Sequence, residues 1–382
     1  MNILYIAPRF HTNQVPIVKG WLESGDNVKV LCQYCMQTED YTVLRPVILG
    51  YSNVFSLFLK IYQRICRKKI MKAQIPTHFN AQFGFPPMKK VKKIINEFHP
   101  DVIIYRDRSI YNLMIYRYCH RKKIKGILYN QTPYWENEVE KTDVFHRLVR
   151  RLGPQIRMTP VLGKEKKGIE AAKGVYYVPF VVEPCLRNVD EKQYFLKGKI
   201  RILCVGKYEE RKHHIELLKA IYELPCRNET EIIFVGECSR SLHEAYMMRL
   251  MDCAQKYGME EQVQILSNMS LEEVYSEYKK ADLFVLPSTG EFASISQLEA
   301  MSCALPVICS NTNGTADCVE EGINGFLFQD NNFSDLKKKL EFALNDRNAL
   351  KNMGKASYEM VLKKYGFENY KKSILKILEN AE

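Results

Sequence analysis

No run of this sequence approaches the ~18 consecutive apolar residues that a membrane-spanning helix needs, so we expect no such helix. The opening residues, MNILYIAPRF, carry neither a basic leader nor a long apolar segment, which argues against a secretory signal peptide. Motifs of the zinc-finger, RNP and basic-zipper kinds are missing, which argues against nucleic-acid binding. The sequence also lacks an Asp-x-Asp pair, and we expect neither a metal ion nor another cofactor.

Paired cysteine motifs are scarce, although the sequence holds 12 Cys. Cys32 and Cys35 form a lone C-x-x-C, without the second pair that a zinc site would need. Others, such as Cys204, Cys303 and Cys309, fall in apolar stretches and are interpreted as small core residues. In the absence of a secretory signal we expect reduced thiols and a cytoplasmic location.

The chain of 382 residues is too long for one hydrophobic core and predicts two domains. Its 46% hydrophobic and 26% charged residues are those of an ordinary globular protein. A net charge of +12 suits three kinds of partner, namely nucleic acid, an anionic membrane surface or an anionic substrate.

Two basic amphipathic stretches, residues 55–72 and 88–98, favour the membrane surface among these partners. The first has an apolar helical face of Phe58, Ile61, Tyr62 and Ile65 beside cations, and the second has cations opposite Val91, Ile94, Ile95 and Phe98. The cations are Lys60, Arg64, Arg67, Lys68, Lys69 and Lys72 in the first stretch and Lys89, Lys90, Lys92 and Lys93 in the second. The alternative is that both are solvated faces of packed helices.

Residues 281–325 contain the pattern around which the chain is organised. A short apolar run at 282–287 ends at a Pro and predicts a buried strand. Residues 292–303 hold no Gly or Pro and have Ile295, Leu298 and Met301 at helical spacing. A second apolar run follows at 306–309. Strand, helix and strand with short connections indicate a βαβ unit and a parallel sheet.

Two carboxylates belong to this unit, Glu291 and Glu299. On a continuous helix their spacing corresponds to roughly 12 Å, about the span from a ribose to the sugar of a nucleotide sugar. The free N–H groups of a helix N-terminus at 293–296 would suit the diphosphate between them. Two glutamates on a solvated helix face would show the same spacing, so the flanking residues decide.

Those flanking residues resemble the donor-site signature of the retaining GT-B glycosyltransferases of glycosyltransferase family 4. They are Pro287, Ser288, Glu291, Glu299, Ala300, Met301, Pro306, Val307, Ile308, Asn313, Gly314, Val319, Gly322, Asn324 and Gly325. The resemblance implies that Glu291 binds hydroxyls of the donor sugar and that Glu299 binds the ribose. This chain departs from the family at Phe292-Ala293-Ser294, because the family usually has Gly-Phe-Gly there.

A second donor motif lies at residues 206–212, after an apolar run at 200–205. Gly206 followed by two cations ahead of a helix is a suitable phosphate site. The stretch resembles the family's G-R-x(4)-K motif, with Lys207 in place of the usual Arg and with Lys212 matching the Lys. Two solvated lysines in a turn are the alternative. The resemblance also implies that the loop with Asn268 and Met269 contacts the base.

Polar residues at the expected strand ends of the N-terminal half are candidates for acceptor binding, because such ends face the ligand crevice of an open α/β sheet. They are His11, Asn13, Arg106, Arg108, Asn130 and Gln131. A loop histidine bonded to a carbonyl, or an ion pair of the arginines with Asp107, would explain some of them equally well.

The sequence therefore predicts an α/β fold of the GT-B type, with two Rossmann-like domains and parallel sheets facing across a cleft. The predicted domains are 1–182 for the acceptor, joined by a C-terminal helix at 366–382, and 183–365 for the nucleotide-sugar donor. The predicted activity is metal-independent, retaining transfer of a sugar to a glycan or lipid-linked acceptor in surface polysaccharide or glycoconjugate synthesis. An inactive GT-B scaffold at a membrane and a phosphorylase-like enzyme are the alternatives. Glu291, Lys212 and Lys207 are the catalytic candidates, and the donor-binding candidates are Gly206, Lys207, Lys212, Asn268, Met269, Glu291, Ala293, Ser294, Ile295 and Glu299.

Overall fold

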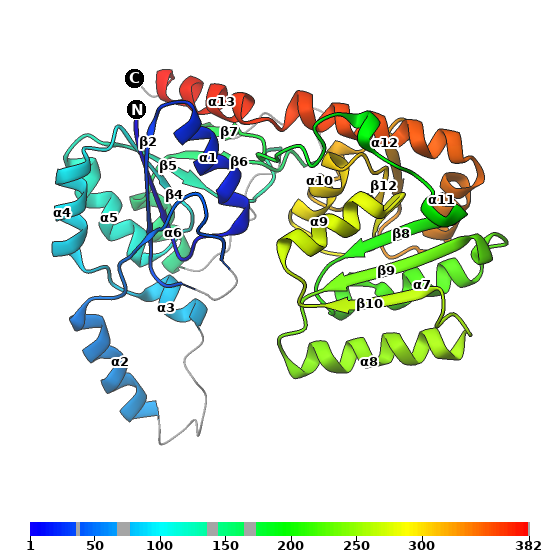
Figure 1. Cartoon of the computed structure of the whole chain (residues 1–382). Helices are drawn as coiled ribbons and strands as arrows, with labels where there is room; N and C mark the ends of the chain where they lie inside the picture. The colour runs from blue at the N-terminus through cyan, green and yellow to red at the C-terminus, as the bar shows by residue number, and fades with distance from the viewer. Residues whose placement is uncertain (36–38, 67–76, 136–143, 164–172, 381–382) are drawn as a thin grey trace. The chain divides into compact units, whose positions relative to one another are not determined.

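The computed structural model describes residues 1–35, 39–66, 77–135, 144–163 and 173–380. The chain divides into two compact units (Figure 1). Unit 1 comprises Met1–Pro160, Glu165–Val181 and Phe367–Glu382, and unit 2 comprises Val161–Lys164 and Val182–Gly366. Each unit has its own parallel sheet and its own core.

Unit 1 is built on a sheet whose described strands follow the order β3-β2-β1-β4-β5-β6-β7, all parallel. The strands are β1 (Asn2–Ala7), β2 (Asn27–Cys32), β3 (Val47–Ile48), β4 (Val102–Tyr105), β5 (Lys125–Tyr129), β6 (Ile156–Thr159) and β7 (Val175–Tyr177). The helices are α1 (Val15–Glu23), α2 (Asn53–Cys66), α3 (Thr77–Phe83), α4 (Met88–Phe98), α5 (Ile110–Arg121), α6 (Val144–Leu152) and α13 (Phe367–Glu379), with a 3₁₀ turn at Thr12–Gln14.

Strand β1 shows why the apolar runs of unit 1 form a sheet covered on both faces. Successive side chains of a strand point to opposite faces, and a parallel sheet buries both. Ile3 and Tyr5 accordingly join the core beside α1 and α13, whereas Leu4 and Ile6 join the core beside α4 and α5. A continuous apolar sequence, rather than an alternating one, is therefore what this strand needs.

The last helix, α13, completes the core of unit 1. Its residues Tyr370, Ile374 and Ile377 are buried in that core. The Tyr370 hydroxyl lies 3.1 Å from the hydroxyl of Tyr5, which in turn accepts a 2.9 Å hydrogen bond from the indole N–H of Trp21. Segments from the two ends of the chain thus share one buried polar and aromatic cluster.

Unit 2 is built on a parallel sheet whose described strands follow the order β10-β9-β8-β11-β12-β13. The strands are β8 (Ile200–Val205), β9 (Thr230–Gly236), β10 (Val263–Ser267), β11 (Leu283–Leu286), β12 (Val307–Ser310) and β13 (Gly325–Phe328). The helices are α7 (His214–Tyr222), α8 (Ser241–Lys256), α9 (Leu271–Lys280), α10 (Ile295–Ser302), α11 (Phe333–Asn345) and α12 (Arg347–Lys364). Short 3₁₀ turns lie at Val189–Glu191, Leu196–Gly198, Glu210–Lys212, Arg227–Glu229 and Ala316–Cys318.

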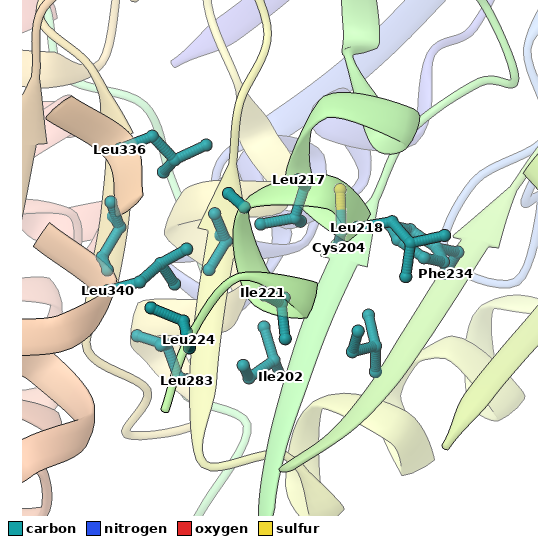
Figure 2. Packing of buried hydrophobic residues seen from close by; sticks show 14 of the residues in the cluster. Ile202, Cys204, Leu217, Leu218, Ile221, Leu224, Phe234, Leu283, Leu336 and Leu340 are labelled. Atoms are coloured by element: carbon teal, nitrogen blue, oxygen red, sulfur yellow. The ribbon is translucent and has the colours of Figure 1, made fainter. Parts of the chain in front are cut away.

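Figure 2 shows the core of unit 2, where α7 and α11 lie against the sheet. Leu217, Leu218 and Ile221 of α7 are fully buried against Ile202 of β8 and Phe234 of β9. Burial of each such side chain contributes about 1.5–3 kcal/mol. This packing fixes α7, and with it the loop between β8 and α7.

The predicted fold class is confirmed, because both units are parallel-sheet Rossmann-like domains. The predicted helix at 292–303 was wrong at its start, since α10 begins at Ile295. Ser294 caps that helix by accepting a 3.3 Å hydrogen bond from the Gln297 N–H, and residues 291–293 form a loop. A separation of Glu291 and Glu299 calculated from helical rise therefore no longer holds. Of the first basic stretch, residues 67–72 lie outside the described residues.

Cys303 was expected to be a small core residue with a reduced thiol, and the second part of this prediction is wrong. Cys303, at the end of α10, forms a disulfide with Cys185, with 5.0 Å between the Cα atoms. The backbone N–H of Cys185 also donates a 3.2 Å hydrogen bond to Ser302. The two cysteines are 118 positions apart and form no short-range motif. Their spacing in the sequence therefore gave no indication of the disulfide.

We expect reduction of this disulfide to lower the free energy of unfolding by about 2–5 kcal/mol, since the open chain regains the entropy of a long loop. Urea unfolding followed by circular dichroism, with and without dithiothreitol, measures the change. The Cys185→Ser variant is the control and should unfold at one midpoint in both buffers. An unfolding midpoint of the wild-type protein that is the same with and without dithiothreitol would contradict the expectation.

Candidate functional site

The candidate donor site lies at the carboxyl edge of the unit 2 sheet, between β8 and β11. These strands are neighbours in the sheet, but the strands that follow them in sequence lie on opposite sides. Strands β9 and β10 lie beyond β8, and strands β12 and β13 lie beyond β11. Such a switch point leaves a crevice beyond the strand ends, and ligands of open α/β sheets bind there. The loops that follow the two strands, residues 206–213 and 287–294, contain the two motifs that the sequence analysis selected.

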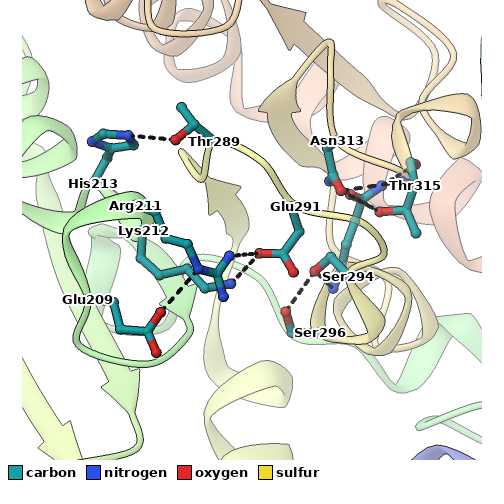
Figure 3. Close-up of polar contacts among 11 residues, drawn as sticks. Glu209, Arg211, Lys212, His213, Thr289, Glu291, Ser294, Ser296, Asn313 and Thr315 are labelled. Atoms are coloured by element: carbon teal, nitrogen blue, oxygen red, sulfur yellow. Dashed lines mark hydrogen bonds and ion pairs between the residues drawn. The ribbon is translucent and has the colours of Figure 1, made fainter. Parts of the chain in front are cut away.

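The two loops are joined by an ion cluster at Glu291 (Figure 3). Its Oε2 accepts from the Lys212 ammonium group and lies 3.0 Å from Nη1 of Arg211. Lys212 is only 8% exposed, and a buried ammonium group needs such a partner. The backbone joins the loops as well, because the Thr289 N–H donates to the Arg211 carbonyl at 3.0 Å.

Gly206 makes room for the buried lysine. A Cβ at this position would lie 3.3 Å from Cδ of Lys212, which is tighter than ordinary packing allows. The glycine at the end of β8 therefore lets the lysine side chain pass across the backbone toward Glu291. This gives a physical reason for the Gly206–Lys212 spacing.

Lys207 occupies a different position from Lys212. Its Nζ pairs with Oε2 of Glu237 at 2.9 Å, and its side chain is 46% exposed. The structure thus brings Lys212, Arg211 and Glu291 together, while Lys207 faces the loop after β9. Of the two lysines in the predicted motif, Lys212 is the one held in the site.

The N-terminus of α10 is fixed by a buried polar network. The Gln297 side chain donates to the Thr315 carbonyl at 2.9 Å, and its Oε1 accepts from Asn313 at 2.7 Å and from the Thr315 hydroxyl at 2.8 Å. Ser294 is buried, and Ala293 and Ile295 beside it are half-buried. The helix terminus that we predicted as the diphosphate site is therefore rigid.

Gly314 brings a neighbouring turn against the loop before α10. Its N–H donates to the Glu291 carbonyl at 2.9 Å. A Cβ on Gly314 would lie 1.7 Å from the Phe292 carbonyl oxygen, which no side chain could tolerate. The absence of a side chain at this position therefore sets the path of residues 291–293.

Glu299 lies in the middle of α10, where its carboxylate accepts a 3.2 Å hydrogen bond from the hydroxyl of Tyr278. Burial raises the pKa of Glu299 to about 7, and the hydrogen bond from Tyr278 offsets this only in part. A carboxylate with this pKa changes its charge near neutral pH.

Asn268 follows β10 and adopts a left-handed backbone conformation, with φ of 55°. Its side chain accepts from the Cys238 N–H at 2.8 Å and donates to the Cys238 carbonyl at 3.0 Å. The loops after β9 and β10 are thus tied together, and Met269 lies half-buried beside this contact. The Asn268 side chain is thus occupied by hydrogen bonds to the backbone of Cys238.

In unit 1, two of the predicted acceptor residues line a small cavity. Nη2 of Arg106 donates to Oδ1 of Asn13 at 3.4 Å, and the guanidinium lies 4.1 Å from the ring centre of Tyr129. Phe180 and Tyr370 supply apolar wall to the same cavity. A stacked arginine beside aromatic walls suits a ligand that is both polar and partly apolar.

The other predicted acceptor residues are dispersed. Asn130 accepts a 3.3 Å hydrogen bond from Arg157, and Gln131 lies 3.4 Å from the Tyr129 hydroxyl. Arg108 lines a second cavity beside Asp107. Burial raises the pKa of Asp107 to about 7, against a hydrogen bond from Ser109 that lowers it.

His11 lies immediately before the 3₁₀ turn that follows β1. Desolvation of its ring, followed by the charges of Arg9 and Arg106, lowers its pKa to about 4. Within the described part of the chain, no group of three or more His, Cys, Asp or Glu side chains is arranged to hold a metal ion.

Sequence reasoning missed three contributors to the donor site. Arg211 shares Glu291 with Lys212, and its place one residue before Lys212 was an available signal. Tyr278 of α9 bonds Glu299, and Gln297 ties α10 to the turn at Asn313. The last two were not accessible from spacing, because their contacts join separate elements.

Comparison with known proteins agrees with this geometry. Residues 187–360 match the sequence model of the family described as glycosyl transferases group 1. An uncharacterised glycosyltransferase of Methanocaldococcus jannaschii is 26% identical over 354 residues, which cover 81% of this chain and 98% of that protein. A D-inositol 3-phosphate glycosyltransferase of Corynebacterium jeikeium is 30% identical over 34% of this chain and 32% of its own length.

Two solved structures have the same fold over nearly their whole length. HepE of Anabaena, solved in complex with UDP, covers 100% of both chains with a TM-score of 0.72 and 13% identity. Sucrose-phosphate synthase of Thermosynechococcus elongatus covers 99% of this chain and 98% of its own, with a TM-score of 0.69 and 15% identity.

Residues 187–360, which include the ion cluster and α10, therefore match the sequence model of the glycosyl transferases group 1 family, and the chain has the GT-B fold.

Proposed function

We propose that this protein is a retaining glycosyltransferase, of the family 4 type, that moves a sugar from a nucleoside diphosphate sugar to a glycan or lipid-linked acceptor. The observation that carries the proposal is the buried Lys212 held with Arg211 against Glu291 at the switch point of unit 2. A cation cluster beside a rigid helix N-terminus is what a departing diphosphate requires.

Each donor-site residue has a role in this proposal. The diphosphate lies between the N-terminus of α10 and Lys212, whose charge stabilises the negative charge that grows on the leaving group. Glu291 accepts hydrogen bonds from sugar hydroxyls, and Glu299 accepts them from the ribose. These groups supply the positive charge without a metal ion. Lys207, paired with Glu237, has a supporting role at the edge of the site.

The acceptor is assigned to unit 1. The cavity with Asn13, Arg106 and Tyr129 provides an amide, a stacked guanidinium and aromatic surface. We assign the reaction to the cytoplasm, whose reducing conditions would keep Cys185 and Cys303 as thiols, and to the synthesis of surface polysaccharide or glycoconjugates. The UDP complex of HepE supports a nucleotide-sugar donor.

A panel of nucleotides and nucleotide sugars tests the proposal. Thermal shifts with UDP, GDP and ADP, followed by their sugars, identify the donor, because a ligand that binds the folded state raises the melting temperature. Transfer is then measured in the presence of EDTA, and the anomeric configuration of the product is read by NMR. Binding without turnover would indicate an inactive scaffold, turnover without any nucleotide a phosphorylase, and an inverted product would contradict retention.

We expect Lys212→Ala to reduce the turnover rate by about 10²–10³-fold, because the variant loses the cation beside the leaving group. Lys207→Ala is the matched control, since that side chain is half-exposed and faces Glu237. It should reduce the rate by about tenfold or less. Steady-state kinetics on both variants measure the difference, and equal losses would contradict the separate roles of the two lysines.

We expect donor binding to weaken as the pH falls through about 7, the raised pKa of Glu299. The ionised carboxylate accepts hydrogen bonds from ribose hydroxyls, and protonation removes that capacity. The affinity at pH 6 should be about one-tenth of that at pH 8. Calorimetry with the nucleotide sugar of the largest thermal shift measures it, because a diester diphosphate does not titrate in this range.

Glu299→Gln is the control for this pH dependence. The neutral amide should bind the donor weakly and equally at both pH values. If the wild-type protein and the variant bind with the same affinity at pH 8, the assignment of Glu299 to the ribose is wrong.

A further inference from the structure

Helix α2 of unit 1 presents an apolar stripe to solvent. Val54, Leu57, Phe58 and Ile61 are 69%, 60%, 51% and 49% exposed, and their spacing places them on one face of the helix. An amphipathic helix of a globular domain normally buries such a face. Among the α2 side chains that the structure describes, Phe55 is buried, at 1% exposed. The centre of its ring lies 5.5 Å from the ring centres of both Tyr51 and Phe85.

In the sequence, the positive charge of the chain is concentrated in the segment that contains this helix. Residues 41–96 contain no Asp or Glu and eleven Lys or Arg. The rest of the sequence holds the other 45 Lys and Arg against all 44 Asp and Glu, so it is nearly neutral. Almost the whole net charge of +12 therefore belongs to the one segment that contains α2.

Helix α4 adds part of this charge to the same side of unit 1. Val91 and Ile95 are buried, whereas Lys89, Lys90, Lys92 and Lys93 are exposed. Lys90 donates a 2.8 Å hydrogen bond to the carbonyl of Ile48 in β3, the edge strand that leads into α2. In Figure 1, α2 and α4 lie along one outer edge of unit 1.

We propose that the α2 stripe, together with Lys60 and the lysines of α4, forms a docking surface for an anionic lipid bilayer. An apolar face flanked by cations, on a helix lying in the membrane plane, is the chemistry of interfacial binding. No helix within the described residues is long and apolar enough to cross a membrane, so the contact is at the surface.

Charge complementarity selects the bilayer over other occupants. A second copy of the chain would bring two strongly positive surfaces together without any carboxylate from residues 41–96 to compensate them. A nucleic acid would use the cations and leave the apolar stripe in water. A bilayer with acidic headgroups satisfies both parts of the surface, because its headgroups meet the lysines and its acyl chains meet the stripe.

Sedimentation of the full chain with lipid vesicles tests the proposal. We expect partition into phosphatidylcholine–phosphatidylglycerol vesicles to exceed partition into pure phosphatidylcholine by about tenfold or more, and to fall as salt rises. Leu57→Ser/Ile61→Ser should weaken partition by about tenfold or more. Lys89→Gln/Lys93→Gln should weaken it by about fivefold for each cation.

Leu242→Ser/Met248→Ser on α8 is the matched control, since Leu242 and Met248 are also exposed apolar residues, at 78% and 61%. This variant should bind vesicles like the wild-type protein. Equal binding to neutral and anionic vesicles, an equal loss in the α8 control, or self-association with no vesicle binding would each overturn the proposal. The thermal shift with the nucleotide is read on the same samples, so a failure of lipid binding is distinguished from a failure of donor binding.

Discussion

The ion cluster at Glu291 is the interaction on which the proposed donor site depends. One carboxylate oxygen meets Lys212 and Arg211, and it thereby joins the loop after β8 to the loop before α10. Because Lys212 is buried, its charge would be costly without this partner. An anionic ligand at the same place meets a cation that is already desolvated and oriented, so little reorganisation is needed when it binds.

Sheet topology explains how this cluster forms from residues 79 positions apart. Strands β8 and β11 are neighbours in a parallel sheet, and their carboxyl ends bring the two loops to one edge. The sequence allowed this to be predicted, because apolar runs marked the strands and the polar residues after them marked the edge. Gly206 and Lys212 were selected in this way, whereas Glu291 and Glu299 were selected from their spacing and from the resemblance of the flanking residues to a family's donor site. The fold class followed from the same alternation of strands and helices.

Other features were beyond the sequence for physical reasons. Periodicity extended α10 back to residue 292, although Ser294 followed by Gln297 was an available N-cap signal. The contact of Gly314 with Phe292 had no such signal, because it joins separate elements. The Tyr278 contact to Glu299 and the Cys185–Cys303 disulfide join separate elements, so neither leaves a local signature. The acceptor candidates illustrate the same limit. The expected strand ends placed these candidates at one edge of the unit 1 sheet. Only the directions of their side chains show that Arg106 bonds Asn13 whereas Asn130 bonds Arg157.

The position of α13 has a consequence for how the chain is made. The helix that covers Tyr5 and Trp21 follows unit 2 along the chain, although the strand and helix beneath it precede unit 2. Domains generally fold as they emerge from the ribosome, N-terminal first. The nascent first unit would therefore keep an apolar face open until α13 is released, whereas the described strands of unit 2 end at Phe328, before α13 begins. The second unit is thus positioned to mature before the first, against the order of synthesis.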